Sequence, residues 1–103
     1  MRESGIEEIV EPMLDLFATE AVKGMASISS ALAAGDLDAL GRAAHSLKSS
    51  AGNIRAKRLA RALQQLETAA MSGDRAAASR VIGTVESEHA AALAYLAERK
   101  KAR

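Results

Sequence analysis

The chain has 103 residues, of which 49% are hydrophobic and only 2% aromatic, and its formal net charge is +1. This length fits a single domain spanning residues 1–103, and the near-zero charge argues against a nucleic-acid binder. The absence of cysteine excludes disulfides, thiolate metal ligands and a cysteine nucleophile. No stretch reaches the roughly 18 apolar residues of a membrane span, and no signal-peptide pattern begins the chain, so we expect a cytoplasmic protein.

Four stretches of the chain carry apolar residues at intervals of three or four positions, the period of an α-helix. Each stretch has a single apolar stripe, which must pack against the other helices. Short connections between four such helices predict an all-α, antiparallel, up-down-up-down four-helix bundle. We expect the methionines to fill its core rather than form a special surface, except that Met13, beside Pro12, could extend an apolar docking patch. The helices are expected, to within about 2–4 residues, over 5–33, 37–52, 55–71 and 75–99.

Three breaks separate these stretches. A glycine followed by an aspartate, at 35–36 and again at 73–74, predicts a helix end and the capped start of the next helix. Gly52 and Asn53 predict the remaining turn. Pro12 can divide the first stretch, so we also allow for a short N-terminal lead helix.

His45, in the second helix, is the candidate reactive residue. At about 100° per residue it lies roughly 130° from the centre of the apolar stripe, so its ring is expected to face solvent. An exposed imidazole is substantially neutral at pH 7, and a neutral ring nitrogen can attack phosphorus to form phosphohistidine. Arg42 and Lys48 lie one turn away and would stabilise the phosphoryl charge. An ordinary surface histidine is the alternative that helix geometry leaves open.

Small residues surround His45 on its helix face. Gly41 and Ser49 lie one turn away, and Gly52 lies a further turn on. A glycine inside a helix costs roughly 1 kcal/mol relative to alanine. Close approach by a partner protein would explain that cost, because bulky neighbours would block the imidazole.

The segment Ala44–Ile54 closely resembles the signature of histidine-phosphotransfer (HPt) domains, H-x-L-K-G or H-x-L-K-S. In that family the segment precedes a turn and a helix that ends in a leucine-glutamate or leucine-glutamine pair, matched here by Leu66-Glu67. Gly35-Asp36-Leu37 is similar to the turn before the histidine helix. The resemblance is dense over 36–67, whereas the flanking helices agree only in length and apolar pattern.

This resemblance implies a role for each matched residue. His45 would be the phosphoacceptor, Lys48 would neutralise the phosphoryl group, and Glu67 would orient the imidazole, although a plain solvated glutamate is an equal alternative. The chain departs from the common family pattern at Ser49 and Arg55, where many members have glycine. The surface expected to dock partners comprises Met13, Gly41, Arg42, Ser49, Gly52 and Arg55.

The resemblance also implies a relay. A response-regulator receiver domain, phosphorylated on aspartate with bound Mg²⁺, would pass its phosphoryl group to His45, and a second receiver would remove it. The donor receiver could belong to a hybrid histidine kinase. The chain itself would be a monomeric phosphocarrier with no kinase activity, no cofactor and no metal.

Three alternatives predict other activities. An adaptor bundle that never carries phosphate would be insensitive to replacement of His45. The dimerisation module of a sensor histidine kinase would have an acidic residue after its histidine and a proline soon after, but Ser46 follows here and no proline occurs after Pro12. A nucleic-acid binder would use Lys57, Arg58, Arg61 and the basic C-terminus, and would bind in a salt-sensitive way.

His89 serves as the comparison for His45. It follows Val85 by four residues and precedes Leu93 by four, so it lies on or beside the apolar stripe of the fourth helix. We expect a packed, hydrogen-bonded histidine there and assign it no functional role.

Overall fold

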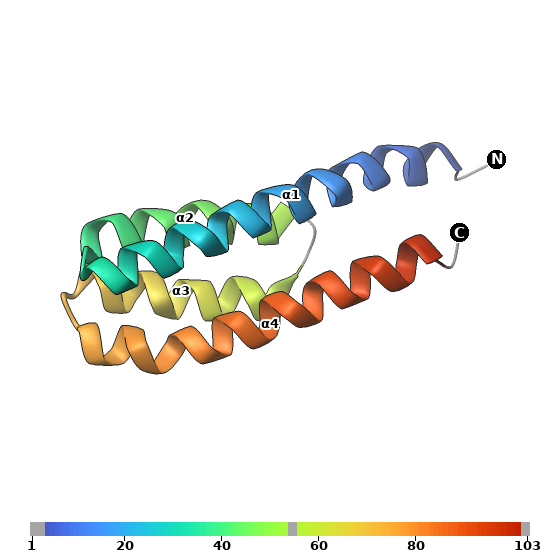
Figure 1. Cartoon of the computed structure of the whole chain (residues 1–103). Helices are drawn as coiled ribbons and strands as arrows, with labels where there is room; N and C mark the ends of the chain where they lie inside the picture. The colour runs from blue at the N-terminus through green and yellow to red at the C-terminus, as the bar shows by residue number, and fades with distance from the viewer. Residues whose placement is uncertain (1–3, 54–55, 102–103) are drawn as a thin grey trace.

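The computed structural model of the chain describes residues 4–53 and 56–101, with side chains over 15–53 and 56–98. Within the described residues there are helices and no strands. Successive helices run in opposite directions, which confirms the antiparallel up-down-up-down bundle (Figure 1). No helix in this part of the chain has the length and apolar character that crossing a membrane requires. The helices are α1 (Ser4–Ala34), α2 (Leu37–Asn53), α3 (Lys57–Met71) and α4 (Arg75–Lys101).

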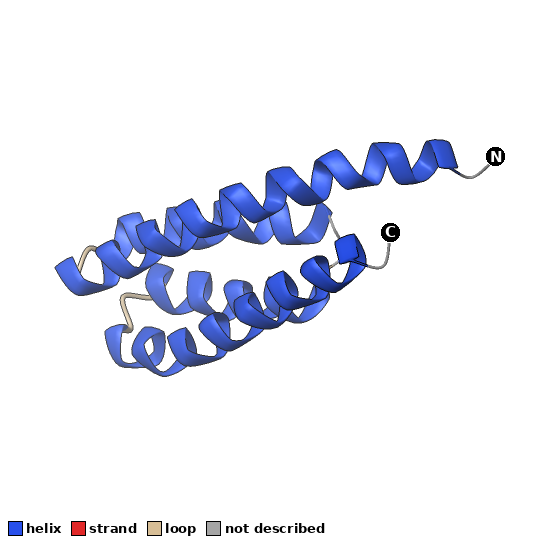
Figure 2. Ribbon diagram, turned by 45° about the vertical axis from the view of Figure 1, so that its right-hand side comes forward, coloured by secondary structure: helices blue, strands red, loops and turns tan. Residues whose placement is uncertain are grey.

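The four helices form a long and a short pair. α1 and α4 contain 31 and 27 residues, whereas α2 and α3 contain 17 and 15. At 1.5 Å per residue, the helices of the long pair are therefore roughly 15–20 Å longer than those of the short pair. The N-terminal part of α1 and the C-terminal part of α4 project beyond the C-terminal end of α2 and the N-terminal end of α3 (Figures 1 and 2).

The structure bears on the predicted break at Pro12 and on the predicted end of the second helix. α1 continues through Pro12, so there is no separate lead helix. A proline removes one helical hydrogen bond, but its fixed φ is itself helical, and the long helix continues on both sides. α2 extends through Gly52 to Asn53, and the Ala56 N–H donates to the Ala51 carbonyl at 2.9 Å to close this end. Gly52 therefore lies in the last turn of the helix, inside the predicted range of 37–52, and the helix ends one residue later than predicted.

The other two turns are built in the same way. Gly35 and Gly73 have φ of +71° and +73°, the left-handed conformation that glycine adopts without strain. The side chains of Asp36 and Asp74 then accept the backbone N–H three residues later, at 3.0 and 2.9 Å. These caps satisfy N–H groups that the first helical turn leaves unpaired. The glycine-aspartate turns are thus confirmed at both positions.

The apolar stripes meet in one core. The largest completely buried side chains are Ile28, Leu40, Leu59, Leu63, Leu66 and Val85, and no polar or charged residue is buried among the described side chains. α2 contributes Leu40, Ala44, Leu47 and Ala51, each at most 3% exposed. Because these four residues fix the rotation of α2 about its axis, they also determine which residues of α2 face solvent.

Met71 is an exception to the expectation that methionines fill the core. Its side chain is 77% exposed at the end of α3, whereas Met25 packs partly buried against the core. The core-facing residues of the last turn of α3 are Ala69 and Ala70. Met71 instead follows Glu67 by four residues and shares the outer face of the helix. The side chains of the other two methionines lie outside the described residues.

Candidate functional site

His45 lies on the outer edge of α2 that borders α3. Its side chain is 62% exposed, while Ala44 and Leu47 on either side of it are buried in the core. The position predicted from the apolar stripe of α2 is therefore confirmed. Burial of the stripe holds the backbone of His45 in place and leaves the imidazole accessible from solvent.

Glu67 brings α3 into contact with this histidine. The completely buried Leu66 fixes α3 against the core, and the adjacent Glu67 side chain, only 13% exposed, reaches the edge of α2. One of its carboxylate oxygens, Oε2, lies 3.0 Å from His45 Nδ1. Glu67 is thus not a plain solvated glutamate but a partner of the imidazole.

The pKa of Glu67 determines which atom of this pair holds the proton. The hydrogen bond from Lys48 lowers the pKa of Glu67 most, the hydrogen bond to His45 lowers it further, and partial burial opposes both. The carboxyl group is therefore ionised at neutral pH and can only accept hydrogen bonds. Nδ1 must then donate, so in the neutral ring the proton lies on Nδ1 and the lone pair on Nε2. Nε2 lies on the ring edge away from Glu67 and carries the free lone pair.

Lys48 is held against α3 by two acceptors. Its Nζ donates to Glu67 Oε1 at 2.8 Å and to Gln64 Oε1 at 2.6 Å, and its side chain is 25% exposed. The Gln64 amide donates in turn to Thr68 Oγ1 at 3.1 Å. Two of the three ammonium donors of Lys48 are therefore used within the protein, which leaves one for an anion at His45.

Gln64 and Thr68 were not predicted from the sequence. Together with Glu67 they occupy the i, i+3 and i+4 positions of α3, which share one helix face. That spacing was visible in the sequence, but it becomes informative only once Glu67 is known to face α2.

The predicted docking residues differ in their exposure. Ser49 is exposed, and its hydroxyl donates to the His45 carbonyl at 3.3 Å, so it lies along the helix rather than over the ring. Gly52 is exposed, and a Cβ there would meet nothing within 4 Å. Arg42 is exposed and ion-paired with Asp38 one turn earlier. Two predicted docking positions, Met13 and Arg55, lie outside the described side chains.

Gly41 is buried, contrary to the exposed position expected of it. A Cβ at this residue would lie 3.5 Å from Ala70 Cβ and 3.7 Å from Met71 Cγ, so Gly41 faces α3. These are ordinary van der Waals distances, and packing alone does not require glycine. Its helical position, between His45 and the core stripe, explains why it points to the neighbouring helix.

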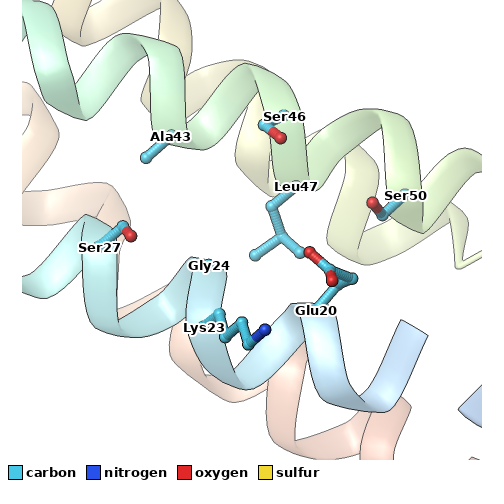
Figure 3. A pocket seen from close by; sticks show the side chains of 8 residues that line it. All are labelled: Glu20, Lys23, Gly24, Ser27, Ala43, Ser46, Leu47 and Ser50. Carbon is cyan, nitrogen blue, oxygen red and sulfur yellow. The ribbon is translucent and has the colours of Figure 1, made fainter. Parts of the chain in front are cut away.

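Surface grooves on opposite sides of α2 differ in their lining. The groove between α1 and α2 holds about 170 Å³ and is lined by polar groups that include Glu20, Lys23 and three serines (Figure 3). Gly24 lets α1 approach α2 there, because a Cβ would lie 3.2 Å from Leu47 Cδ2. The groove between α2 and α3 holds about 680 Å³ and includes His45 and Glu67 in its lining. Of the two, the groove between α2 and α3 adjoins His45.

His89 on α4 has a different environment. It is partly buried, and burial lowers its pKa. Its Nε2 is buried, and within the described part of the chain no group forms a hydrogen bond with it. The expected packing is confirmed, but the expected hydrogen bond at this nitrogen is not found. Over the same residues, no three side chains of His, Cys, Asp or Glu gather into a metal-binding cluster.

Comparison with known proteins agrees with this architecture. No curated protein sequence matches the chain. The structure is similar to that of the histidine-containing phosphotransfer protein B (HptB) from Pseudomonas aeruginosa, with a TM-score of 0.90 and 29% sequence identity, over 98% of this chain and 88% of that one. The sequence matches the Hpt domain family over residues 12–98, which is most of its length. The chain therefore belongs to the Hpt domain family, whose members are phosphocarriers that interact with receiver domains in phosphorelays.

Proposed function

We propose that this chain accepts a phosphoryl group on Nε2 of His45 from the aspartyl phosphate of one receiver domain and passes it to the aspartate of another. The observation that carries the proposal is the hydrogen bond between His45 Nδ1 and Glu67 Oε2 at 3.0 Å, on an imidazole that is 62% exposed. That hydrogen bond places the lone pair on the accessible nitrogen. Family membership supports receiver domains as the partners.

The transfer step follows from this arrangement. The Nε2 lone pair attacks the phosphorus of the aspartyl phosphate, an N–P bond forms, and the P–O bond breaks to release the aspartate as a carboxylate. The ring then carries a positive charge, with the proton still on Nδ1. The ionised Glu67 stabilises that charge through the same hydrogen bond, and no proton needs to move. The second receiver reverses the step with its own aspartate.

Lys48 serves two purposes in this proposal. It lowers the pKa of Glu67 and holds that carboxylate by a hydrogen bond, and its remaining N–H donor can approach the phosphoryl oxygens on His45. The Mg²⁺ that activates the reaction would be bound by the receiver, which supplies most of the catalysis. The chain contributes a positioned nucleophile and needs no kinase activity or cofactor of its own.

The docking face is the surface around His45. Arg42, Ser49 and Gly52 are exposed there, and we propose that Met13 and Arg55 extend it. Each receiver must dissociate after transfer, so the complex is expected to be transient and its interface modest. A monomer suffices for this role.

The two histidines provide the test. Phosphorylated receiver domains with Mg²⁺ would be mixed with the native chain, His45→Ala and His89→Ala, and the label transferred to each would be measured. The native chain and His89→Ala should acquire an acid-labile phosphoryl group, and His45→Ala should acquire none. Equal labelling of all three variants would contradict the proposal. No labelling of the folded native chain by any receiver would favour an adaptor that carries no phosphate.

A further inference from the structure

Four large apolar side chains are prominently exposed on the described surface. They are Leu16, Val22, Met71 and Tyr95, all at least 60% exposed. Scattered exposed apolar residues are normal and need no explanation. Of these four, Met71 is the one that lines the groove containing His45 and Glu67. Its exposure therefore coincides with the candidate site rather than with an unrelated surface.

The groove has an apolar part and a reactive part. Leu37, Ala70 and Met71 line it toward the end of α3, and His45 and Glu67 line it nearer the middle of α2. Gly41 lies between the helices, where a methyl group would meet Ala70 and Met71 at 3.5 and 3.7 Å. The missing side chain of Gly41 keeps this part of the groove deep. The exposed Arg42–Asp38 ion pair lies at its edge and contributes no net charge.

Simple geometry places Met71 beneath any partner that reaches His45. Met71 is four residues, about 6 Å along the helix axis, beyond Glu67, and Glu67 contacts His45. A typical protein interface covers about 800 Å² on each partner, equivalent to a disc of roughly 16 Å radius. A receiver centred on His45 therefore covers Met71 and the apolar part of the groove. Unless a partner side chain enters that part, water stays against its apolar side chains, and the packing contacts that a partner side chain would make there are lost.

We propose that this groove receives an apolar side chain of the receiver domain docked on His45, and that Met71 is a specificity-determining contact for it. The inference rests on the proposed function above and adds an interaction that the reacting residues do not explain. The flexible, polarisable methionine suits a carrier that must pack against more than one receiver. Apolar anchors of this kind contribute more to binding than paired charges at the rim.

Transfer kinetics with substituted chains would test this contact. Single-turnover transfer from a phosphorylated receiver would be measured over a range of carrier concentrations for the native chain, Met71→Ala and Met71→Lys. Met71→Lys should raise the half-saturating concentration about tenfold or more, and Met71→Ala should raise it less. The saturating rate should change by less than about twofold. Because Met71 is 77% exposed, neither substitution should unfold the bundle, which circular dichroism would verify.

Val22→Lys is the matched control. Val22 is 60% exposed on α1 and does not line the groove, so the same added charge there should leave the half-saturating concentration unchanged. Equal behaviour of Met71→Lys and the native chain would overturn the docking contact, as would equal effects of Met71→Lys and Val22→Lys. A loss of saturating rate alone would assign Met71 to the chemical step and also overturn it.

The failure of this contact is distinguishable from failure of the carrier role. If the native chain accepts no phosphoryl group, the proposed function fails, whereas the docking contact fails only against a native chain that transfers. Sedimentation of the native chain and Met71→Lys would reveal another occupant. A native dimer that the substitution dissociates would show that a second copy fills the groove, and would overturn the receiver proposal.

Discussion

The two histidines of this chain show how position on a helix determines what an imidazole can do. His45 lies opposite the apolar stripe of α2, is 62% exposed and has a carboxylate at Nδ1. His89 lies beside the stripe of α4, is partly buried and has no hydrogen-bond partner at Nε2 among the described residues. One ring can present a lone pair to a partner, while the other is held neutral in the protein. The contrast arises from the environment rather than from residue type.

Removal of the carboxylate should make the largest change to the environment of His45. Glu67→Ala deletes the acceptor that fixes the Nδ1 proton and the charge that stabilises the phosphorylated ring. We expect phosphoryl transfer to slow by about 10- to 100-fold, as when groups that orient a reactive imidazole are lost. Glu67→Gln retains an acceptor oxygen without the charge and should lose less. Rapid-quench transfer assays would compare them, and a native rate for Glu67→Ala would show that the hydrogen bond is dispensable.

Replacement of Lys48 should have the second-largest effect on phosphoryl transfer. Lys48→Met removes the main cause of the lowered pKa of Glu67, so that pKa should rise toward its usual value. Because the pKa of Glu67 is lower in the folded state, its ionisation raises the free energy of unfolding at neutral pH. This stabilisation is lost as pH falls through the folded-state pKa. The substitution should therefore reduce the acid dependence of unfolding and slow transfer about tenfold. Carboxyl NMR titration would measure the pKa, and an unchanged value would contradict the assignment.

Replacement of Gln64, which acts on the site through Lys48, should slow phosphoryl transfer less. The neighbouring Gln65 provides a matched control. Gln64 accepts from Lys48 Nζ at 2.6 Å, whereas the adjacent Gln65 is exposed one position further along α3. We expect Gln64→Leu to slow transfer a few-fold, consistent with the loss of one charge-assisted hydrogen bond of about 1.5–3 kcal/mol that other groups partly replace. Gln65→Leu should behave as the native chain. Equal rates for both variants would mean that Gln64 does not position Lys48.

The sequence was sufficient for the features that depend on one helix at a time. The period of the apolar stripe predicts α2 and the exposure of His45, and the glycine-aspartate pairs predict two turns. Helical spacing placed Lys48 beside His45, and the family resemblance added Glu67. The structure then places both side chains within hydrogen-bond distance of one another.

The features that the sequence did not predict depend on how two helices lie against each other. Gly41 shares a helix face with His45, but only the contact with α3 shows that it is buried. Met71 is apolar like the residues of the core, yet the rotation of α3 set by Leu66 and Ala70 places its side chain in solvent. Hydrophobic periodicity gives the direction of a residue within its own helix and carries no information on the neighbour it meets.

His89 should have the smallest effect, and it bears on stability rather than transfer. Burial lowers its pKa, so the unfolded chain binds a proton more readily than the folded chain. Above the unfolded-state pKa of about 6.5, His89 is neutral in both states and does not lower the free energy of unfolding. As pH falls from that value toward the folded-state pKa, proton uptake by the unfolded chain lowers the free energy of unfolding. Unfolding by denaturant between pH 7.5 and 5.5, set by the same reference pKa of about 6.5, should show decreasing stability for the native chain. His89→Leu, which cannot take up that proton, should lose less stability over this range, while its phosphoryl transfer remains native. An equal decrease in both chains would assign the pH dependence to another group and leave His89 without a measurable effect.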